Sequence, residues 1–283
     1  MLVARIDAHE GPVYAPDGDT LYFTTVRRAR VAIKRLALRD GSLTVVRPDA
    51  NMANGMCAGS DGDLLVCEQG TLSQPARITR LDPSSGRVEP VVDSFLGLPL
   101  NSPNDVVARS DGTIWFTDPS YGWLQGFRPA PRLADHVYRY DPATGSIAIV
   151  TDALDKPNGL AFSPDERVLY VGDSGAVHGP DDYDPARPRR VLAFDVVNGG
   201  LAKERVFADD IPGFPDGIKV DVDGRVYVSC AEGVLIFAPD GRPLDEIPLP
   251  GAVNFTFGGP GRDVLFITAD TAVWAVRLKT EGD

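Results

Sequence analysis

Six residues that carry a side-chain oxygen recur along the chain, each at the start of a short strand-like segment. They are Glu10, Asn54, Asn104, Asn158, Asp216 and Asn254. Mixed carboxylate and amide oxygens suit a hard cation, and Ca²⁺ takes about six to eight of them, with water completing the shell. Asn, Asp and Gly also favour the turns that precede strands, so a purely structural role is the alternative. We expect one divalent cation, Ca²⁺, to bind near these oxygens.

Zinc is not indicated by the same residues. Zn²⁺ prefers His or Cys ligands, and the three histidines, His9, His136 and His178, have no ligand spacing. His9 precedes Glu10, but neighbouring residues on a strand face opposite ways. We therefore interpret His9 as a packing or turn residue.

Each of the six oxygen-bearing residues opens one copy of a repeated pattern. The copies follow one another at intervals of 44, 50, 54, 58 and 38 residues. Each copy has a short strand, a tight turn rich in Asp and Gly, and a second strand with aromatic residues, as in NDVVARSDGTIWFTDP from Asn104. This repeat length is typical of one four-stranded propeller blade. The sequence therefore predicts an all-β fold, a six-bladed β-propeller formed by residues 1–283 as a single domain.

The remaining strands fall where each blade needs them. In the third copy we expect strands at 104–109, 113–118, 135–142 and 146–154, because apolar and polar residues alternate there. The sixth copy contains only three strand patterns before the chain ends, and an unpaired strand edge is a liability. We infer that residues 2–6 supply the fourth strand of the last blade.

The propeller topology also predicts which loops surround the six residues. The innermost strands begin at one end of the channel, and the connections between second and third strands return to that end. Two of these connections are long, at residues 119–134 and 175–189, and long loops often carry specificity. The candidate substrate contacts in them are Tyr121, Trp123, Phe127, Arg128, Arg132, His178 and Tyr183.

Composition narrows the class of partner. The formal net charge of −12 opposes binding to nucleic acid or to anionic membrane surfaces. No segment reaches the ~18 apolar residues of a membrane span, and MLVARIDAHEG lacks the apolar run of a signal peptide. Three cysteines without a pairing pattern fit a reducing compartment. We expect a cytoplasmic protein that acts on a small molecule.

Several sequence motifs resemble those of the gluconolactonase family, which includes senescence marker protein and luciferin-regenerating enzyme. The motifs are EGPVY, SPNDVVARSDGTIWFTDPSYG, KPNGLAFSPDERVLY, FPDGIKVDVDGRVYVSCAEG and FTFGG. The resemblance covers nearly the whole chain, and YGWLQGFRP followed by HVYRYDP is similar to the lactonohydrolase branch. It implies a propeller lactonase that uses a divalent cation.

The resemblance also implies roles for individual residues. Glu10, Asn158 and Asp216 match the metal ligands of the family, and Asn104 matches a position that binds either the metal or substrate and water. The animal aldonolactonases carry an Arg two residues before this Asn, where this chain has Ser102. Recognition of a sugar acid by that Arg is therefore absent.

These residues lead us to expect hydrolysis of a lactone, a carboxylic ester, to its hydroxy acid. The cation would polarise the carbonyl group while Asp216, the only Asp of the six, takes a proton from the attacking water. Asp105, Asp118 and Asp173 are alternative bases, and the chain has no GxSxG nucleophile motif.

Three other functions stay open at this level. A related calcium propeller could hydrolyse phosphotriesters, and activity on organophosphates rather than lactones would identify it. A non-catalytic binding propeller, or a calcium-free propeller similar to strictosidine synthase, has no need for carboxylates in its channel.

Overall fold

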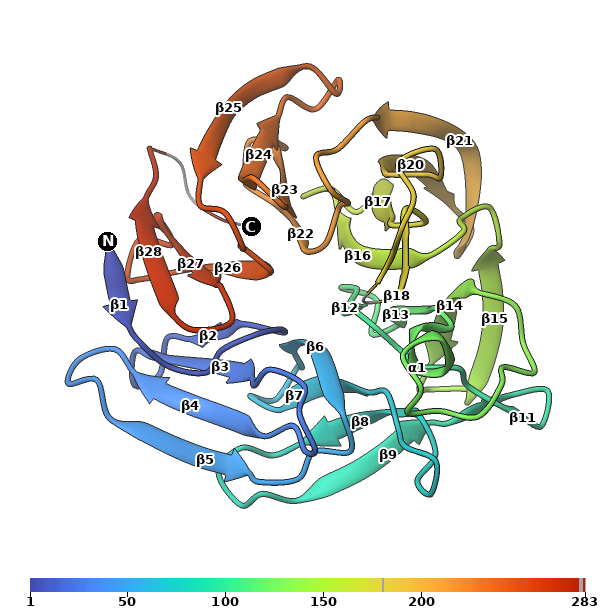
Figure 1. Cartoon of the computed structure of the whole chain (residues 1–283), viewed down its shortest axis with the longest axis horizontal. Coiled ribbons are helices and arrows are strands. Elements are labelled where there is room, and N and C mark those ends of the chain that lie inside the picture. The colour runs from blue at the N-terminus through green and yellow to red at the C-terminus, as the bar shows by residue number, and fades with distance from the viewer. Residues whose placement is uncertain (180, 280–281, 283) are drawn as a thin grey trace.

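Six four-stranded antiparallel sheets surround a central channel in the computed structural model, which describes residues 1–179, 181–279 and 282 (Figure 1). The predicted all-β, six-bladed propeller is thereby confirmed. Blade 1 is formed by β2 (Val13–Ala15), β3 (Thr20–Thr24), β4 (Ile33–Ala37) and β5 (Leu43–Arg47). Blade 2 is formed by β6 (Ala53–Ala58), β7 (Leu64–Glu68), β8 (Arg77–Leu81) and β9 (Val88–Val92). Blade 3 is formed by β12 (Val106–Ala108), β13 (Ile114–Asp118), β14 (His136–Asp141) and β15 (Ser146–Thr151).

The second half of the ring repeats this arrangement. Blade 4 is formed by β16 (Pro157–Phe162), β17 (Val168–Asp173), β20 (Arg190–Val197) and β21 (Gly200–Ala208). Blade 5 is formed by β22 (Ile218–Val220), β23 (Val226–Cys230), β24 (Gly233–Phe237) and β25 (Pro243–Pro248). Blade 6 is formed by β26 (Asn254–Gly258), β27 (Val264–Thr268), β28 (Val273–Arg277) and the N-terminal β1 (Leu2–Ala4).

The first strand of the chain closes the ring. β1 pairs with β28 in antiparallel register, Leu2 opposite Trp274 and Ala4 opposite Val273. The N-terminal end of the chain lies beside β28 in Figure 1. The prediction that the N-terminus completes the last blade is confirmed, with a strand of residues 2–4 rather than 2–6.

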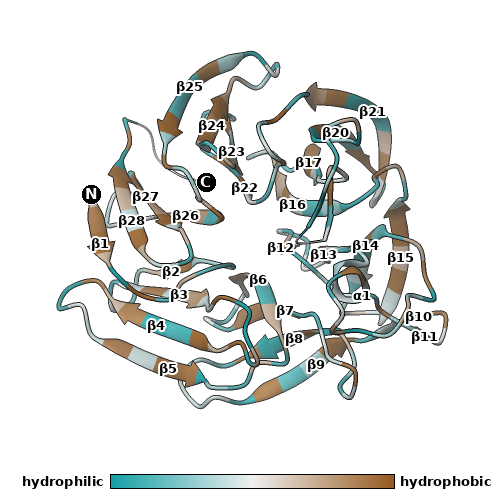
Figure 2. Ribbon diagram, in the orientation of Figure 1, coloured by the Kyte–Doolittle hydropathy of each residue, from teal (hydrophilic) through white to brown (hydrophobic). Residues whose placement is uncertain are grey.

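The hydrophobic core lies between the blades. Along β3, Leu21 and Phe23 pack towards blade 6, while Tyr22 packs towards blade 2. Successive residues of a strand point to opposite faces, so each sheet contributes to two interfaces. The third strand of blade 1, β4, is only partly buried at Lys34 and Arg35 and has a hydrophilic middle between hydrophobic ends (Figure 2). Packing between neighbours therefore depends on every blade being present.

Glycine allows the innermost strands to approach one another closely. Gly159 follows Asn158, and a Cβ atom at Gly159 would collide with the carbonyl oxygen of Asp216 in the next blade. Gly217 follows Asp216, and its Cβ would collide with the side chain of Asn254. The Asn-Gly and Asp-Gly pairs of the repeat thus bring the oxygen-bearing residues of adjacent blades together.

The long connections carry short elements of their own. The connection after β13 contains the helix α1 (Tyr121–Leu124), and the connection after β17 contains a hairpin of β18 (Val177–Gly179) and β19 (Asp182–Tyr183). A second hairpin, of β10 (Ser94–Phe95) and β11 (Leu98–Pro99), precedes blade 3. Within the described residues, no helix has the length and apolarity needed to cross a membrane.

Deletion of residues 1–4 tests the closure of the ring. Loss of β1 exposes the edge of β28 and uncovers the cluster of apolar side chains between blades 6 and 1, so we expect a lower free energy of unfolding by roughly 2–4 kcal/mol. The measurement is chemical denaturation of the truncated and full chains, with Arg5→Gln, a change at an exposed residue, as the control. A truncated protein as stable as the full chain would show that β1 does not hold the ring closed.

Candidate functional site

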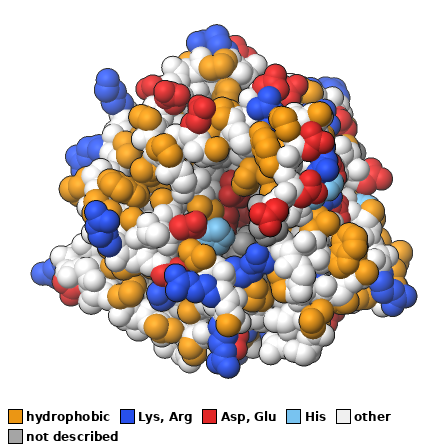
Figure 3. All heavy atoms as spheres, in the orientation of Figure 1, with side chains coloured by type: hydrophobic (Ala, Val, Ile, Leu, Met, Phe, Trp, Pro, Cys, Tyr) orange, Lys and Arg blue, Asp and Glu red, His pale blue; other side chains and the backbone are white. Residues whose placement is uncertain are grey.

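A cavity of about 290 Å³ opens at the end of the channel where the inner strands begin. Five of the six oxygen-bearing residues line it: Glu10, Asn54, Asn104, Asn158 and Asp216. Figure 3 shows the hollow at the centre of the molecule, with acidic side chains around it. The sixth residue, Asn254, lies outside the cavity wall and donates a hydrogen bond from Nδ2 to Glu10 Oε2 (2.8 Å).

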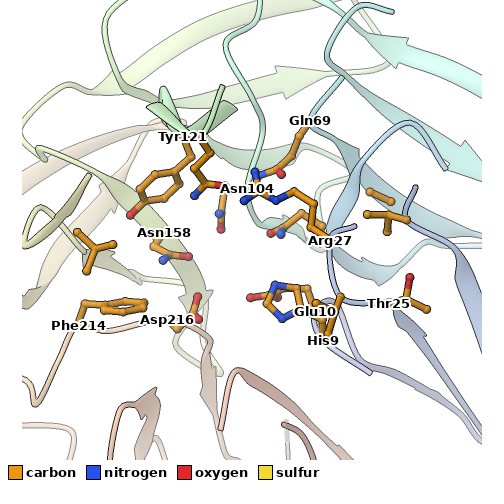
Figure 4. A pocket seen from close by; sticks show the side chains of 16 residues that line it. His9, Glu10, Thr25, Arg27, Gln69, Asn104, Tyr121, Asn158, Phe214 and Asp216 are labelled. Atoms are coloured by element: carbon orange, nitrogen blue, oxygen red, sulfur yellow. The ribbon is translucent and has the colours of Figure 1, made fainter. Parts of the chain in front are cut away.

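The carboxylates of Glu10 and Asp216 lie side by side in this cavity (Figure 4). Glu10 is 4% exposed, and the two side chains are close enough to share a hydrogen bond. Burial raises the pKa of Asp216 well above its usual range, and the negative charge of Glu10 raises it further, while a hydrogen bond from Asn158 opposes the shift. Asp216 is partly buried, and two like charges in contact within a cavity are unfavourable unless a proton or a cation joins them.

Hydroxyl groups at the ends of the second strands fix the backbone of the oxygen-bearing residues, which are called the ring residues below. Thr24 Oγ1 donates to the carbonyl of Glu10 (3.0 Å), and Thr117 Oγ1 donates to the carbonyl of Asn158 (2.9 Å). In blade 5 the contact is between backbone groups, and the N–H of Asp216 donates to the backbone carbonyl oxygen of Ser229 (3.0 Å). Buried hydrogen bonds of this kind hold polar backbone in one position, so the oxygen-bearing side chains start from fixed points of the backbone.

Unsatisfied oxygens and charge in this cavity fit a hard divalent cation. Asn54 Oδ1 is buried and has no hydrogen-bond partner in the described part of the chain. Glu10 and Asp216 together balance two positive charges, and amide oxygens can complete an oxygen shell. Among residues 1–179, 181–279 and 282, no group of three or more His, Cys, Asp or Glu side chains is arranged to hold a metal. A cation at this site would therefore need the amide oxygens as ligands.

His9 lines the cavity next to Glu10, so the expectation that the two side chains face opposite ways is wrong. The strand rule does not apply, because residues 9–12 precede β2 and are not part of a strand. His9 Nδ1 lies 2.7 Å from Asp270 Oδ1. Burial lowers the pKa of His9, but the hydrogen bond to Asp270 and the charge of Glu10 outweigh it, so the net shift is upward.

The three alternative bases lie outside the cavity wall. Asp118 accepts hydrogen bonds from the N–H groups of Asn101 and Ser102 (both 2.8 Å), and burial raises its pKa to about 7. Asp173 has the same arrangement in blade 4, where it accepts from two backbone N–H groups. Asp105 is buried, with its Oδ2 4.0 Å from Lys219 Nζ. These carboxylates support the loops and the channel interior.

Of the candidate substrate contacts, Tyr121 lines the cavity. Arg128 is buried, and its guanidinium donates to backbone carbonyls including those of Leu100 and Asn101. His178 Nε2 lies 3.1 Å from Asp155 Oδ2. The other four candidates also lie outside the wall: Trp123 and Tyr183 are about half exposed, Arg132 is exposed, and Phe127 packs beneath Arg27.

Several wall residues were not predicted from the sequence. They are Thr25, Val26, Arg27, Val31, Ala53, Gln69, Gln125, Val177 and Phe214. Thr25 and Gln69 directly follow the second strands β3 and β7, so the short connections of blades 1 and 2 also return to the channel. The sequence analysis looked for substrate contacts only in the two long connections, and so it missed the wall residues in the short ones.

Comparison with known proteins identifies relatives of the whole chain. The family model described as SMP-30/Gluconolactonase/LRE-like region matches residues 8–271. A gluconolactonase of Zymomonas mobilis is 31% identical over 100% of this chain and 82% of its own length. Lactonohydrolase oryL of Aspergillus oryzae is 30% identical over 97% of this chain and 69% of its own length. A solved structure of a gluconolactonase from Xanthomonas campestris is 34% identical, with a TM-score of 0.84, and covers 98% of this chain and 88% of that one.

Replacement of Asp216 by Asn should change stability in opposite directions with and without calcium. The raised pKa means that the folded metal-free protein binds a proton more tightly than the unfolded chain does, so this contribution to stability is present at acid pH and is lost as pH rises. Asp216→Asn removes the repulsion with Glu10, so we expect the metal-free variant to be more stable at neutral pH by roughly 1–3 kcal/mol.

Calcium at a concentration of a hundred times its Kd should stabilise the unsubstituted protein by ~2.7 kcal/mol and so raise its Tm. It should raise the Tm of Asp216→Asn far less. Thermal unfolding with EDTA or with calcium measures both effects, and Asp152→Asn, at an exposed residue, is the matched control. The paired-carboxylate site would be contradicted if Asp216→Asn had a lower Tm than the unsubstituted protein in EDTA and if calcium raised the Tm of both proteins equally.

Proposed function

The chain belongs to the SMP-30/gluconolactonase/LRE-like family, and we propose that it is a lactonase that opens a small lactone ring with the help of one bound Ca²⁺. The observation that carries the proposal is the pair of adjacent carboxylates, Glu10 and Asp216, beside amide oxygens in the central cavity. The relatives named gluconolactonase and lactonohydrolase support this substrate class. Glu10, Asn158 and Asp216 are the proposed ligands of the cation, with Asn104 as a ligand or substrate contact.

The cation supplies, when bound, a positive charge that polarises the lactone carbonyl and stabilises negative charge on its oxygen. Oxygen ligands of mixed carboxylate and amide type favour calcium over zinc. Asn254 Nδ2 and Gly11 N–H both donate to Glu10 Oε2 (2.8 and 3.1 Å), so the orientation of this carboxylate is fixed. Glu10 thus serves mainly to hold positive charge in place.

Asp216 is the proposed general base. Its carboxylate lies in the cavity, where it can take a proton from a water molecule beside the bound lactone. The proton comes from the water molecule that attacks the carbonyl carbon. After the carbon–oxygen bond of the ring breaks, this proton passes to the alkoxide leaving group, so the product is a hydroxy acid with no net gain of protons by the protein.

The remaining wall residues bind and orient the lactone ring of the substrate. Tyr121 is buried, and burial first and then the charge of Asp216 raise the pKa of its phenol well above the usual range, so it stays a hydrogen-bond donor. Phe214 and Val177 give the cavity an apolar side that excludes water. A volume of about 290 Å³ is at the lower limit of small-molecule sites, ~300–1,000 Å³, and suits a compact ring.

Phosphotriester hydrolysis would use the same cavity and is the second activity to assay. The named relatives favour the lactone. A non-catalytic binding propeller is a poorer explanation, because burial of two adjacent carboxylates is costly for a scaffold without a ligand.

The calcium dependence of two variants separates metal holding from proton transfer. Glu10→Gln should weaken calcium binding, because an amide oxygen is neutral, and excess calcium should restore much of the kcat. Asp216→Asn also weakens the site, but an amide cannot act as a base, a role worth ~10²–10⁴-fold. We therefore expect kcat of Asp216→Asn to stay low at saturating calcium.

Lactonase kcat is measured against calcium concentration for both variants, with occupancy determined independently by elemental analysis. If saturating metal restores Asp216→Asn as fully as Glu10→Gln, then Asp216 is only a ligand and the base is another residue of the wall.

A further inference from the structure

Arg27 places a cation in the wall of the cavity. It lies in the connection between β3 and β4, where Val26 N–H donates to Asp7 Oδ1 (2.7 Å) and Thr25 Oγ1 accepts from Ala32 N–H (3.0 Å). Its side chain extends into the cavity on the side where Gln69 and Asn104 lie (Figure 4). The two residues that precede Arg27 are therefore held by hydrogen bonds.

The guanidinium group of Arg27 is stacked but not neutralised. Its central carbon lies 4.7 Å from the centre of the Phe127 ring, which covers one face and leaves the N–H groups at its edge available. No carboxylate of the described residues lies within 4.0 Å of it. Among the described residues that line the cavity, Arg27 is the only Arg or Lys.

The charges of the cavity therefore do not cancel once a divalent cation is present. Glu10 and Asp216 balance the two charges of that cation, and Arg27 adds one further positive charge that no residue of the wall offsets. Asp270 pairs with His9 at 2.7 Å and so serves a different partner. A partly buried cation without a counter-ion is stabilised by an anion from solution, and a guanidinium matches a carboxylate best, through two parallel hydrogen bonds.

We propose that Arg27 binds a carboxylate carried outside the lactone ring, so that the substrates are lactones of dicarboxylic acids. This substrate class rests on the proposed lactonase function. The ring carbonyl would lie towards Glu10 and Asp216, and the second carboxylate would reach the side of the cavity formed by Arg27. Phe127 is then a positioning residue, because it orients the guanidinium without lining the cavity itself.

Two lactones that differ at one carbon test this assignment. Glucaro-1,4-lactone carries a carboxylate where glucono-1,4-lactone carries a hydroxymethyl group. We expect the original protein to favour the first by kcat/KM. Arg27→Gln should lower this preference by about 10- to 100-fold, the loss of one charge-assisted pair, mainly through KM. Arg27→Lys should keep part of the preference, and Phe127→Leu should lower it by about 2- to 5-fold.

The control is Arg28→Gln, which removes the same charge at the adjacent, exposed position and should leave the preference unchanged. An unchanged preference in Arg27→Gln would overturn the proposal and leave Arg27 with the structural role of holding Phe127. Equal effects of Arg27→Gln and Arg28→Gln would assign the preference to long-range charge and would overturn it as well.

A binding measurement separates this inference from the lactonase function. Calorimetric titration with glucarate and with gluconate, at matched calcium, needs no turnover. If neither lactone is hydrolysed, but Arg27→Gln weakens glucarate binding about 10- to 100-fold without the same loss for gluconate, the lactonase proposal fails and the carboxylate site stands. If the two acids bind alike to both proteins, the carboxylate site fails whatever the lactonase result.

Discussion

The contact between two carboxylates inside the central cavity, those of the buried Glu10 and the partly buried Asp216, is the constraint on which the rest of this structure depends. A closed ring of six sheets is needed to bring these residues together, because they lie in blades 1 and 5 and are separated by about two hundred residues of sequence. Asn254 of blade 6 lies between them in the ring and hydrogen bonds to Glu10. Burial and then the negative charge of Glu10 raise the pKa of Asp216, and a divalent cation would turn the repulsion between the two carboxylates into attraction.

The ring residues, which carry the oxygen atoms, and the mouth of the cavity have different structural origins. The ring residues belong to the starts of inner strands, where glycine allows close approach and hydroxyl groups such as that of Thr117 hold the backbone. The mouth is formed by connections between second and third strands, which differ in length and composition from blade to blade. Arg27 and Tyr121 come from two such connections. On the proposals above, the ring holds positive charge while the mouth selects the substrate.

The length of the sequence repeat and the residue types within it were enough to predict the blades and the oxygen-bearing residues that line the cavity. Alternating strands and Asn-Gly or Asp-Gly pairs repeat at blade length, so the positions of Asn158 and Asp216 follow from the pattern alone. The loops were harder, because a polar side chain in a loop can turn either to the cavity or to the backbone. Arg128 satisfies backbone carbonyls, whereas Arg27 enters the cavity, and no local pattern distinguishes them. The location in the cytoplasm stays a prediction.

Direct determination of calcium stoichiometry and position tests the central claim that the paired carboxylates exist to hold one cation. The protein is freed of metal with EDTA, equilibrated with saturating calcium, analysed for bound metal and crystallised under the same conditions. The account predicts one calcium per chain, bound by Glu10, Asn158 and Asp216 at ~2.3–2.6 Å. Crystals without cation density between Glu10 and Asp216, from protein that binds no calcium in solution, would contradict it.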